Sequence, residues 1–308
     1  MSDLLFKEND CFKVFYDQFM GHGGNGSVYK VCIILNKHTG NEVSLDSDYV
    51  IKIYNSQIDY KPERVEKVHL RCDREIKALT VLQGKHVAPE LLSLDGMLIF
   101  GTDWFVMKSY VTKVNVYFEK TESIAKFHRK LEFFKKLADA FLVLHSNGIC
   151  HRDLKRNNIL LDCDDPLLCD FGLVYMDDTE SEMRVTFGNE IIGSPGFIAP
   201  ELFGRASVKG WLEKDVYTKS DVFALTRLFA CSMLGRTFLG ECADISGLLQ
   251  SLKIQGLSNT ASNIFKGILS ECYIQGTCFN FKNRISVSEL KTYIVSFPAF
   301  YNLIQETQ

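Results

Sequence analysis

Proline, glycine and long apolar runs are scarce in this sequence. It has 6 prolines and 21 glycines in 308 residues, which excludes collagen-like and low-complexity disordered chains. No stretch approaches the roughly 18–20 uninterrupted apolar residues of a membrane-spanning helix. The most apolar run, 141–149, contains His145 and Asn147. The first eleven residues mix charged with apolar side chains, so we expect neither a secretory signal nor membrane insertion.

An excess of positive charge is also missing. The 35 Lys and Arg residues face 38 Asp and Glu residues, and a net charge of −3 gives no field that favours nucleic acid. The ten cysteines form no Cys-x-x-Cys pair and no zinc-binding spacing. Dispersed cysteines in a chain of this length indicate free thiols. We therefore expect a cytoplasmic or other reducing intracellular location, and delivery into a host cell stays open.

Hydrophobic residues are plentiful, at 46% with 23 Phe, and they suffice for one large domain or two lobes. Strand-like patterns dominate the first hundred residues, at 11–20, 27–35, 49–54, 91–94, 97–100 and 104–110. A helix is expected between Pro62 and Gly84, and the chain is mainly helical from about Glu122 onward. This order predicts an α+β protein with a β-rich N-terminal lobe and a larger helical C-terminal lobe.

A glycine cluster lies between the first two expected strands and contains Gly21, Gly23, Gly24 and Gly26. Glycines let backbone N–H groups approach phosphate oxygens because no Cβ stands in the way. The following segment is a strand, whereas the dinucleotide-binding version of this pattern needs a helix there. By itself the cluster also fits a simple turn.

Lys52 stands inside the apolar strand 49–54, and Glu75 follows 23 residues later in the expected helix. A lysine in such a strand usually faces solvent. A buried lysine needs a partner, and a pair with Glu75 would hold the ammonium group against phosphates.

The most specific pattern spans residues 151–172. His-Arg-Asp-Leu-Lys-Arg-Asn-Asn occupies 151–158, Asp-Phe-Gly follows at 170–172, and Ala-Pro-Glu stands at 199–201. The His-Arg-Asp-x-x-x-x-Asn motif followed by Asp-Phe-Gly is highly specific for protein kinases. From about residue 14 to 298 the chain resembles the catalytic domain of a eukaryotic-type (Hanks-type) serine/threonine protein kinase.

The resemblance implies one bilobal catalytic domain. Its small antiparallel N-lobe, with one main helix, would span about 14–108, the hinge about 108–113 and the helical C-lobe about 114–298. ATP and Mg would be the cofactors, and serine or threonine hydroxyls of protein substrates would accept the γ-phosphoryl group.

The resemblance also implies residue roles. Asp153 would act as catalytic base, Lys155 would steady the γ-phosphate, and Lys52 would contact the α- and β-phosphates. Asn158 and Asp170 would hold two magnesium ions. The implied nucleotide-binding residues are Met20, Gly21, Gly23, Gly24, Gly26, Val28, Val50, Lys52, Glu75, Met107 and Tyr110.

Structural roles are implied for three further residues: Asp221 would brace the catalytic loop, and Glu201 would pair with Arg284. Ser194 would touch Asp153 and Lys155, and together with Lys155 it indicates serine/threonine specificity. Thr226 departs from the family pattern, in which glycine is common at this position.

Two other functions compete with an active protein kinase. A pseudokinase scaffold would have lost Lys52, Asp153 or Asp170, and all three are present. A small-molecule kinase of the choline or aminoglycoside type would lack Lys155 and the Gly-Ser-Pro to Ala-Pro-Glu segment at 193–201.

Substrate preference and regulation are the last predictions. Nine acidic residues and one base, Arg184, lie between Asp162 and Glu190, which favours substrates that are basic around the phosphoacceptor. Glu190 stands where the activating phosphate of many kinases is placed. Whether it substitutes for that phosphate, or whether Thr186, Thr179 or Ser181 is phosphorylated instead, stays open, as do the physiological substrate, organism, pathway and oligomeric state.

Overall fold

The computed structural model describes residues 4–22, 26–54, 62–110, 114–177, 193–202, 214–237, 239 and 245–306. The chain forms two compact units. The first consists mainly of Met1–Tyr110 and includes Cys169–Val174, and the second contains Val111–Leu168 and most of the remaining chain. The first unit therefore gives way to the second after Tyr110.

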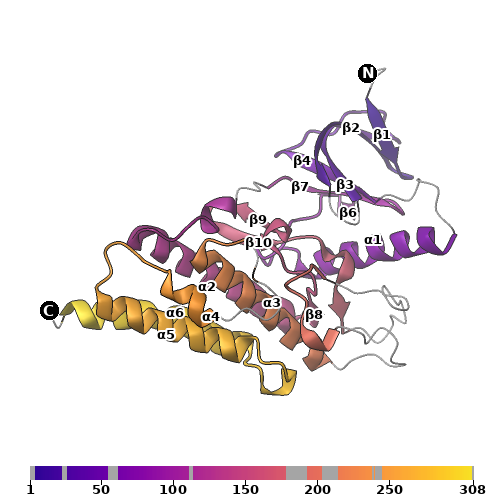
Figure 1. The fold of residues 1–308 in the computed structure, drawn as a ribbon. Coiled ribbons are helices and arrows are strands. Elements are labelled where there is room, and N and C mark those ends of the chain that lie inside the picture. The colour runs from indigo at the N-terminus through magenta and orange to yellow at the C-terminus, as the bar shows by residue number, and fades with distance from the viewer. Residues whose placement is uncertain are drawn as a thin grey trace. The chain divides into compact units, whose positions relative to one another are not determined.

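The first unit is built on a five-stranded antiparallel sheet with strand order β1-β2-β3-β4-β7 (Figure 1). Its strands are β1 (Leu5–Glu8), β2 (Phe12–His22), β3 (Gly26–Asn36), β4 (Tyr49–Tyr54) and β7 (Trp104–Lys108). Residues rich in β-branched and aromatic side chains form the sheet, and its core includes Val14, Ile34 and Ile51 with no exposed surface.

Two details of this unit differ from the sequence-based expectation. The edge strand β1 was not expected, because its four residues are mostly exposed and show no clean apolar alternation. The segments expected at 91–94 and 97–100 contain the short pair β5 (Ser93–Leu94) and β6 (Met97–Leu98), and Leu91 and Phe100 add isolated bridges to β7.

Helix α1 (Pro62–Leu82) begins at the expected proline, whose fixed φ suits a first helical position. Its buried face includes Cys72, Ile76, Leu79 and Leu82. The helix packs against the 3₁₀ turn η3 (Phe171–Leu173), which follows Asp170. This contact brings the Asp-Phe-Gly motif and Glu75 of α1 together within one unit.

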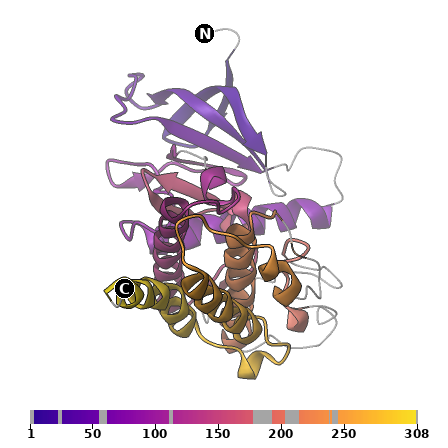
Figure 2. The same cartoon turned by 60° about the vertical axis from the view of Figure 1, so that its left-hand side comes forward.

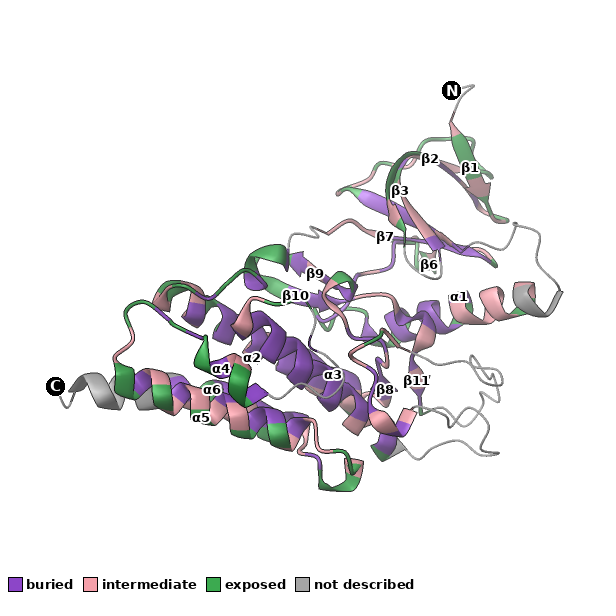
Figure 3. Ribbon diagram, viewed as in Figure 1, coloured by how far each residue is buried: buried purple, intermediate pink, exposed green. Residues whose placement is uncertain are grey.

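The second unit is mainly helical, as expected from the sequence. Its helices are α2 (Ile124–Ser146), α3 (Lys214–Leu234), α4 (Ile245–Gln250), α5 (Asn259–Gly276) and α6 (Val287–Glu306). Helix α2 packs against α6, and α5 contacts both α3 and α6 (Figure 2). Every residue of α3 from Ser220 to Met233 is buried, so this helix is the centre of the unit (Figure 3).

The second unit also contains short strand pairs and 3₁₀ turns, which the sequence patterns did not predict. The strand pairs are β8 (Ile149–Cys150) with β11 (Tyr175–Met176) and β9 (Ile159–Asp162) with β10 (Asp165–Leu168). The 3₁₀ turns are η1 (Val114–Tyr117), η2 (Arg156–Asn158), η4 (Pro200–Leu202) and η6 (Phe281–Asn283). Among the helices that the structure describes, none combines the length and the apolar character that crossing a bilayer requires.

Candidate active site

The first unit contains a buried cluster of one cation and two carboxylates. Lys52 lies in the middle of β4, and its Nζ is 2.9 and 2.7 Å from the two carboxylate oxygens of Glu75 on α1. The same Nζ lies 2.8 Å from Oδ1 of Asp170. Lys52 is 6% exposed and Glu75 2%, so the solvent-facing alternative for this lysine is wrong.

Burial by itself would lower the pKa of Lys52, but the carboxylates of Asp170 and Glu75 outweigh it and raise that pKa above its ordinary value. The side chain is therefore a fixed positive charge at neutral pH. A fixed ammonium group is able to bind phosphate oxygens.

Two further groups contact Glu75. The backbone N–H of Phe171 donates to Oε1 at 3.3 Å, and the hydroxyl of Tyr54 donates to Oε2. Asp170 itself has φ 66° and ψ 62°, in the left-handed region that aspartate tolerates better than most residues. The Asp-Phe-Gly segment thus supplies a carboxylate to Lys52 and a backbone donor to Glu75.

The glycine-rich turn between β2 and β3 is described only at its two ends. Gly21 lies in β2, Gly26 begins β3, and Gly23 and Gly24 lie outside the described residues. A Cβ on Gly26 would stand 2.4 Å from the carbonyl oxygen of Ile53, so only glycine fits there. A Cβ on Gly21 would meet nothing within 4 Å, so no steric demand explains this glycine.

The sheet register places the implied adenine-contacting residues close to Lys52. Val28 is the partner of Lys52 across β3 and β4, and Val50 is the partner of Met107 across β4 and β7. Val50 and Met107 are buried, whereas Met20 is 52% exposed at the end of β2. Tyr110 is half-buried just beyond β7.

The second unit holds the catalytic-loop residues around Asp153, which is 5% exposed. Ser194 Oγ donates to its Oδ1 at 2.7 Å, and Lys155 Nζ donates to Oδ2 at 2.8 Å. Asn158 donates through Nδ2 to the backbone oxygen of Asp153 at 2.8 Å and to Oδ2 at 3.1 Å. Four donor contacts therefore fix the residue that the resemblance makes the base.

Asp221 on α3 anchors the backbone of this loop. Its two carboxylate oxygens accept the N–H groups of His151 and Arg152, each at 2.8 Å. Nε2 of His145 lies 2.9 Å from the same carboxylate. Arg152 has φ 65°, so the chain turns through the left-handed region immediately before Asp153. The bracing implied by the sequence is present.

The Glu201–Arg284 pair is also present and fully buried. Two guanidinium nitrogens of Arg284 donate to the two carboxylate oxygens of Glu201 at 2.6 and 2.9 Å. Arg284 also donates to the backbone oxygens of Cys278 and Lys219. This bidentate pair ties the Ala-Pro-Glu segment to the loop before α6.

Comparison with known proteins identifies the family. The family described as "Protein kinase domain" matches residues 16–292, which is most of the chain. The chain belongs to the protein kinase family.

Two of the similar proteins are named as serine/threonine-protein kinases, and a third is named as a phosphorylase kinase catalytic chain. The putative serine/threonine-protein kinase 040L of Invertebrate iridescent virus 3 is 26% identical, over 64% of this chain and 66% of its own length. The CBL-interacting serine/threonine-protein kinase 20 of Arabidopsis thaliana is 28% identical, over 61% of this chain and 39% of that protein. The human phosphorylase b kinase gamma catalytic chain, liver/testis isoform, is 29% identical, over 58% of this chain and 41% of that protein. The matches thus cover from under a third to about two thirds of the relatives' own lengths.

The sequence analysis missed one buried residue that contacts the Gly-Ser-Pro-Gly segment at 193–196. Arg227 on α3 is 2% exposed and donates to the backbone oxygens of Gly196 and Leu239 and to the hydroxyl of Tyr273. It thus links the Gly-Ser-Pro-Gly segment to α3 and α5. The available signal was an arginine inside the apolar run of α3, since a buried arginine there must find acceptors.

The donor groups of Asn158 and Asp170 fit magnesium. Both hydrogen bonds of Asn158 use its amide nitrogen, which directs that NH₂ group to Asp153, so the side-chain carbonyl oxygen is the atom that would serve a metal ion. Asp170 offers carboxylate oxygen. Hard oxygen ligands of this kind are those that Mg²⁺ prefers.

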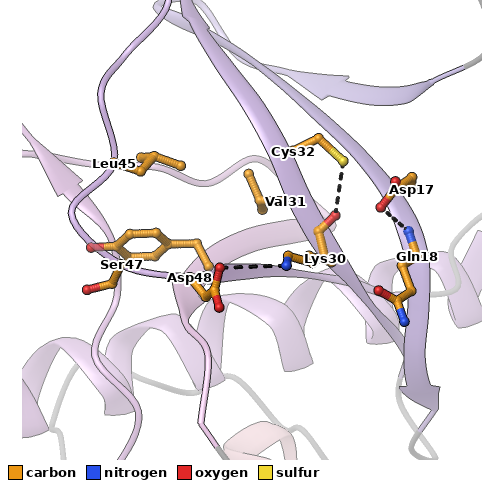
Figure 4. Close-up of a pocket in the computed structure, with 9 residues that line it drawn as sticks. Asp17, Gln18, Lys30, Val31, Cys32, Leu45, Ser47 and Asp48 are labelled. Atoms are coloured by element: carbon orange, nitrogen blue, oxygen red, sulfur yellow. Dashed lines mark hydrogen bonds and ion pairs between the residues drawn. The ribbon is translucent and has the colours of Figure 1, made fainter.

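A hollow of about 440 Å³ lies elsewhere on the first unit, between β2, β3 and the segment before β4 (Figure 4). Its lining includes the ion pair of Lys30 and Asp48, whose charged atoms are 3.7 Å apart. None of the sequence-predicted site residues lines this hollow, so it plays no part in the site described above.

Proposed function

We propose that this protein transfers the γ-phosphoryl group of ATP to serine and threonine hydroxyls of proteins. The observation that carries the proposal is the environment of Asp153, whose carboxylate is buried and bound by Lys155 and Ser194. A carboxylate held in this way is oriented to accept a proton, and the neighbouring ammonium group favours a transferring phosphoryl group.

The proposed step is an in-line displacement. The substrate oxygen forms a bond to the γ-phosphorus, the bond to the β-phosphate oxygen breaks, and the hydroxyl proton passes to Asp153. Lys52 binds the α- and β-phosphates while Glu75 and Asp170 hold its ammonium group. Asn158 and Asp170 would bind magnesium, which neutralises phosphate charge when present.

Serine/threonine specificity is the finer part of the proposal. It is supported by Lys155 and Ser194, which both bind Asp153, and by the names of two relatives at 26% and 28% identity. A preference for basic substrates is also proposed, on the acidic segment between Asp162 and Glu190. Two of its acids already have partners on α2, because Arg129 pairs with Asp164 and Lys136 with Asp165. Asp170 is likewise engaged, by Lys52, so the other acids of the segment would provide the attraction.

Radiolabelled ATP tests the proposal with a generic basic protein, a peptide library and no added substrate. We expect label on serine and threonine of the protein and the peptides, enrichment of Arg or Lys around the phosphoacceptor, and loss of labelling in Lys52→Met. Label on tyrosine alone would reject the hydroxyl class. No protein labelling by the wild type would favour the scaffold, and labelling of a small alcohol instead would favour the small-molecule kinase. A library without basic enrichment would reject only the substrate preference.

We also propose that the protein resides in a reducing intracellular compartment. This location is supported by the nine cysteines that the structure describes, which are all free thiols.

A further inference from the structure

Tyr54 is the last residue of β4 and lies two positions after Lys52. Side chains two apart on a strand point to the same face, so both reach the face on which Glu75 lies. Tyr54 is 1% exposed, and its ring centroid is 5.1 Å from Nζ of Lys52. Its hydroxyl donates to Oε2 of Glu75, and the backbone oxygen of Arg71 lies 3.4 Å away as a second acceptor. A phenol has one hydrogen, and the carboxylate is the stronger acceptor.

The hydroxyl completes the set of donors around Glu75. Oε1 accepts from Lys52 at 2.9 Å and from the N–H of Phe171 at 3.3 Å. Oε2 accepts from Lys52 at 2.7 Å and from Tyr54. Two side chains of strand β4, Lys52 and Tyr54, therefore donate to the carboxylate, and the backbone N–H of Phe171 donates to it from the Asp-Phe-Gly segment.

We propose that Tyr54 is a positioning residue, whose hydroxyl holds the Glu75 carboxylate in the orientation that fixes the ammonium group of Lys52. The inference rests on the proposed function, because it assigns Tyr54 to the phosphate-binding step of that reaction. Without the hydroxyl, Glu75 loses one of its constraints, and Lys52 is drawn further to its other partner, Asp170. The ammonium group then spends less time where the phosphates of ATP need it.

The donor persists throughout the working pH range. Burial and the neighbouring carboxylates of Glu75 and Asp170 raise the pKa of Tyr54 well above its ordinary value. The phenol therefore keeps its proton wherever a kinase assay is run. A tyrosine that only filled core volume would act through its ring, which Tyr54→Phe retains.

The test compares Tyr54→Phe with Tyr49→Phe. Tyr49 lies at the other end of the same strand, is also buried, and donates to Asp46 at 2.8 Å instead of to the ion pair. For Tyr54→Phe we expect the KM for ATP and the Kd of a fluorescent ATP analogue to rise roughly tenfold, with kcat at saturating ATP falling less than about twofold. Tyr49→Phe should leave all three constants unchanged. Wild-type constants in Tyr54→Phe would overturn the inference.

A double-mutant cycle with Glu75→Gln shows whether Tyr54 acts through Glu75. Once Glu75→Gln has removed the carboxylate, we expect Tyr54→Phe to weaken nucleotide binding no further. Fully additive losses would mean that the hydroxyl acts elsewhere and would overturn the inference.

The nucleotide titration separates this inference from the proposed function. A wild type that binds the ATP analogue in a Tyr54-dependent way but labels no protein would support the inference and reject phosphoryl transfer to proteins. A wild type that labels proteins, with Tyr54→Phe indistinguishable from it, would overturn the inference alone.

Discussion

The carboxylate of Asp153 shows what single side chains contribute to this kinase. Its two oxygens accept from Ser194, Lys155 and Asn158, while the backbone preceding it is fixed by Asp221. The donors come from the catalytic loop and from the Gly-Ser-Pro segment that precedes the Ala-Pro-Glu motif. They restrict the rotation of the carboxylate, so that its orientation is set before a substrate arrives.

Asp153→Asn tests the role of this carboxylate at the residue scale. Asparagine keeps the shape but cannot take up the hydroxyl proton. We expect kcat to fall at least about 100-fold while the Kd of an ATP analogue changes less than about twofold. Steady-state kinetics and a nucleotide titration measure the two effects.

The matched control for this substitution is Asp162→Asn, which changes an exposed aspartate in β9. It should leave kcat unchanged. Near-normal turnover in Asp153→Asn would contradict the proposed base.

Among the elements, α3 is unusual because it is buried on all sides although it carries polar residues. Asp221 binds the catalytic loop, Arg227 binds Gly196, and Ser232 donates to the backbone oxygen of Tyr117. Thr226 fits beside Gly276 of α5, where a Cβ would stand 2.1 Å from its Oγ1. The threonine that replaces the common glycine is thus matched by a glycine on the neighbouring helix.

Lys130 joins α2 to the end of this central helix. It is 1% exposed, and its Nζ donates to Oγ1 of Thr121 at 2.8 Å, to the backbone oxygen of Ser232 at 2.6 Å and to that of Glu119. Burial lowers the pKa of Lys130 from 10.5 to about 8, with a smaller contribution from Lys126. The folded protein therefore releases this proton at a lower pH than the unfolded chain.

Because the pKa of Lys130 is lower in the folded protein than in the unfolded chain, the stability of the protein depends on pH. Below pH 8 both states are protonated, and the folded state carries the full cost of the buried charge. Between about pH 8 and 10.5 the unfolded chain binds more protons, so the free energy of unfolding rises with pH. Relative to Lys130→Met, the wild type should gain about 3 kcal/mol across this window, since the pKa shift is about 2.5 units.

Urea unfolding of the wild type and Lys130→Met at several pH values measures this gain. The difference between the two proteins removes the titration of other groups. Lys135→Met is the control, because Lys135 is a solvent-facing lysine on the same helix, paired with Glu132 at 3.0 Å. A wild-type minus Lys130→Met difference that stays flat from pH 7.5 to 10.5 would show that the charge of Lys130 is not destabilised by burial.

At the scale of the whole molecule, the segment before Gly193 bears on how the proposed activity is regulated. The segment that contains Glu190, Thr186, Thr179 and Ser181 lies outside the described residues. Counted back from Gly193, the position usually phosphorylated is Glu190. A carboxylate carries one charge against nearly two for a phosphate, and we propose that it gives basal activity without an upstream kinase.

Unphosphorylated protein, verified by mass spectrometry, tests this switch. We expect Glu190→Ala to lose roughly 10- to 100-fold of the activity, in line with a charge-assisted contact of about 1–3 kcal/mol, and Thr186→Ala to keep it. The reverse pattern, or an inert phosphatase-treated wild type, would assign the switch to phosphorylation.

Sequence alone was sufficient for the parts that depend on neighbours along the chain. The start of α1 at Pro62, the strand 49–54 and the motifs at 151–158 and 170–172 are short-range patterns, whose backbone geometry and chemistry are encoded within a few residues. The strand pattern alone favoured a solvent-facing Lys52, whereas the kinase resemblance implied its pair with Glu75, 23 residues away.

Tertiary structure alone decided which polar groups meet across long separations. The sequence pattern does not show that the hydroxyl of Tyr54 donates to Glu75, or that the ammonium group of Lys130 donates to the backbone oxygen of Ser232, 102 positions away. The strand pair β8–β11 likewise joins segments that are too short to give a pattern of their own. Such contacts depend on which surfaces the packed helices and sheet bring together. A local pattern of apolar and polar residues fixes an element and its buried face, but not the acceptor that a buried donor will find.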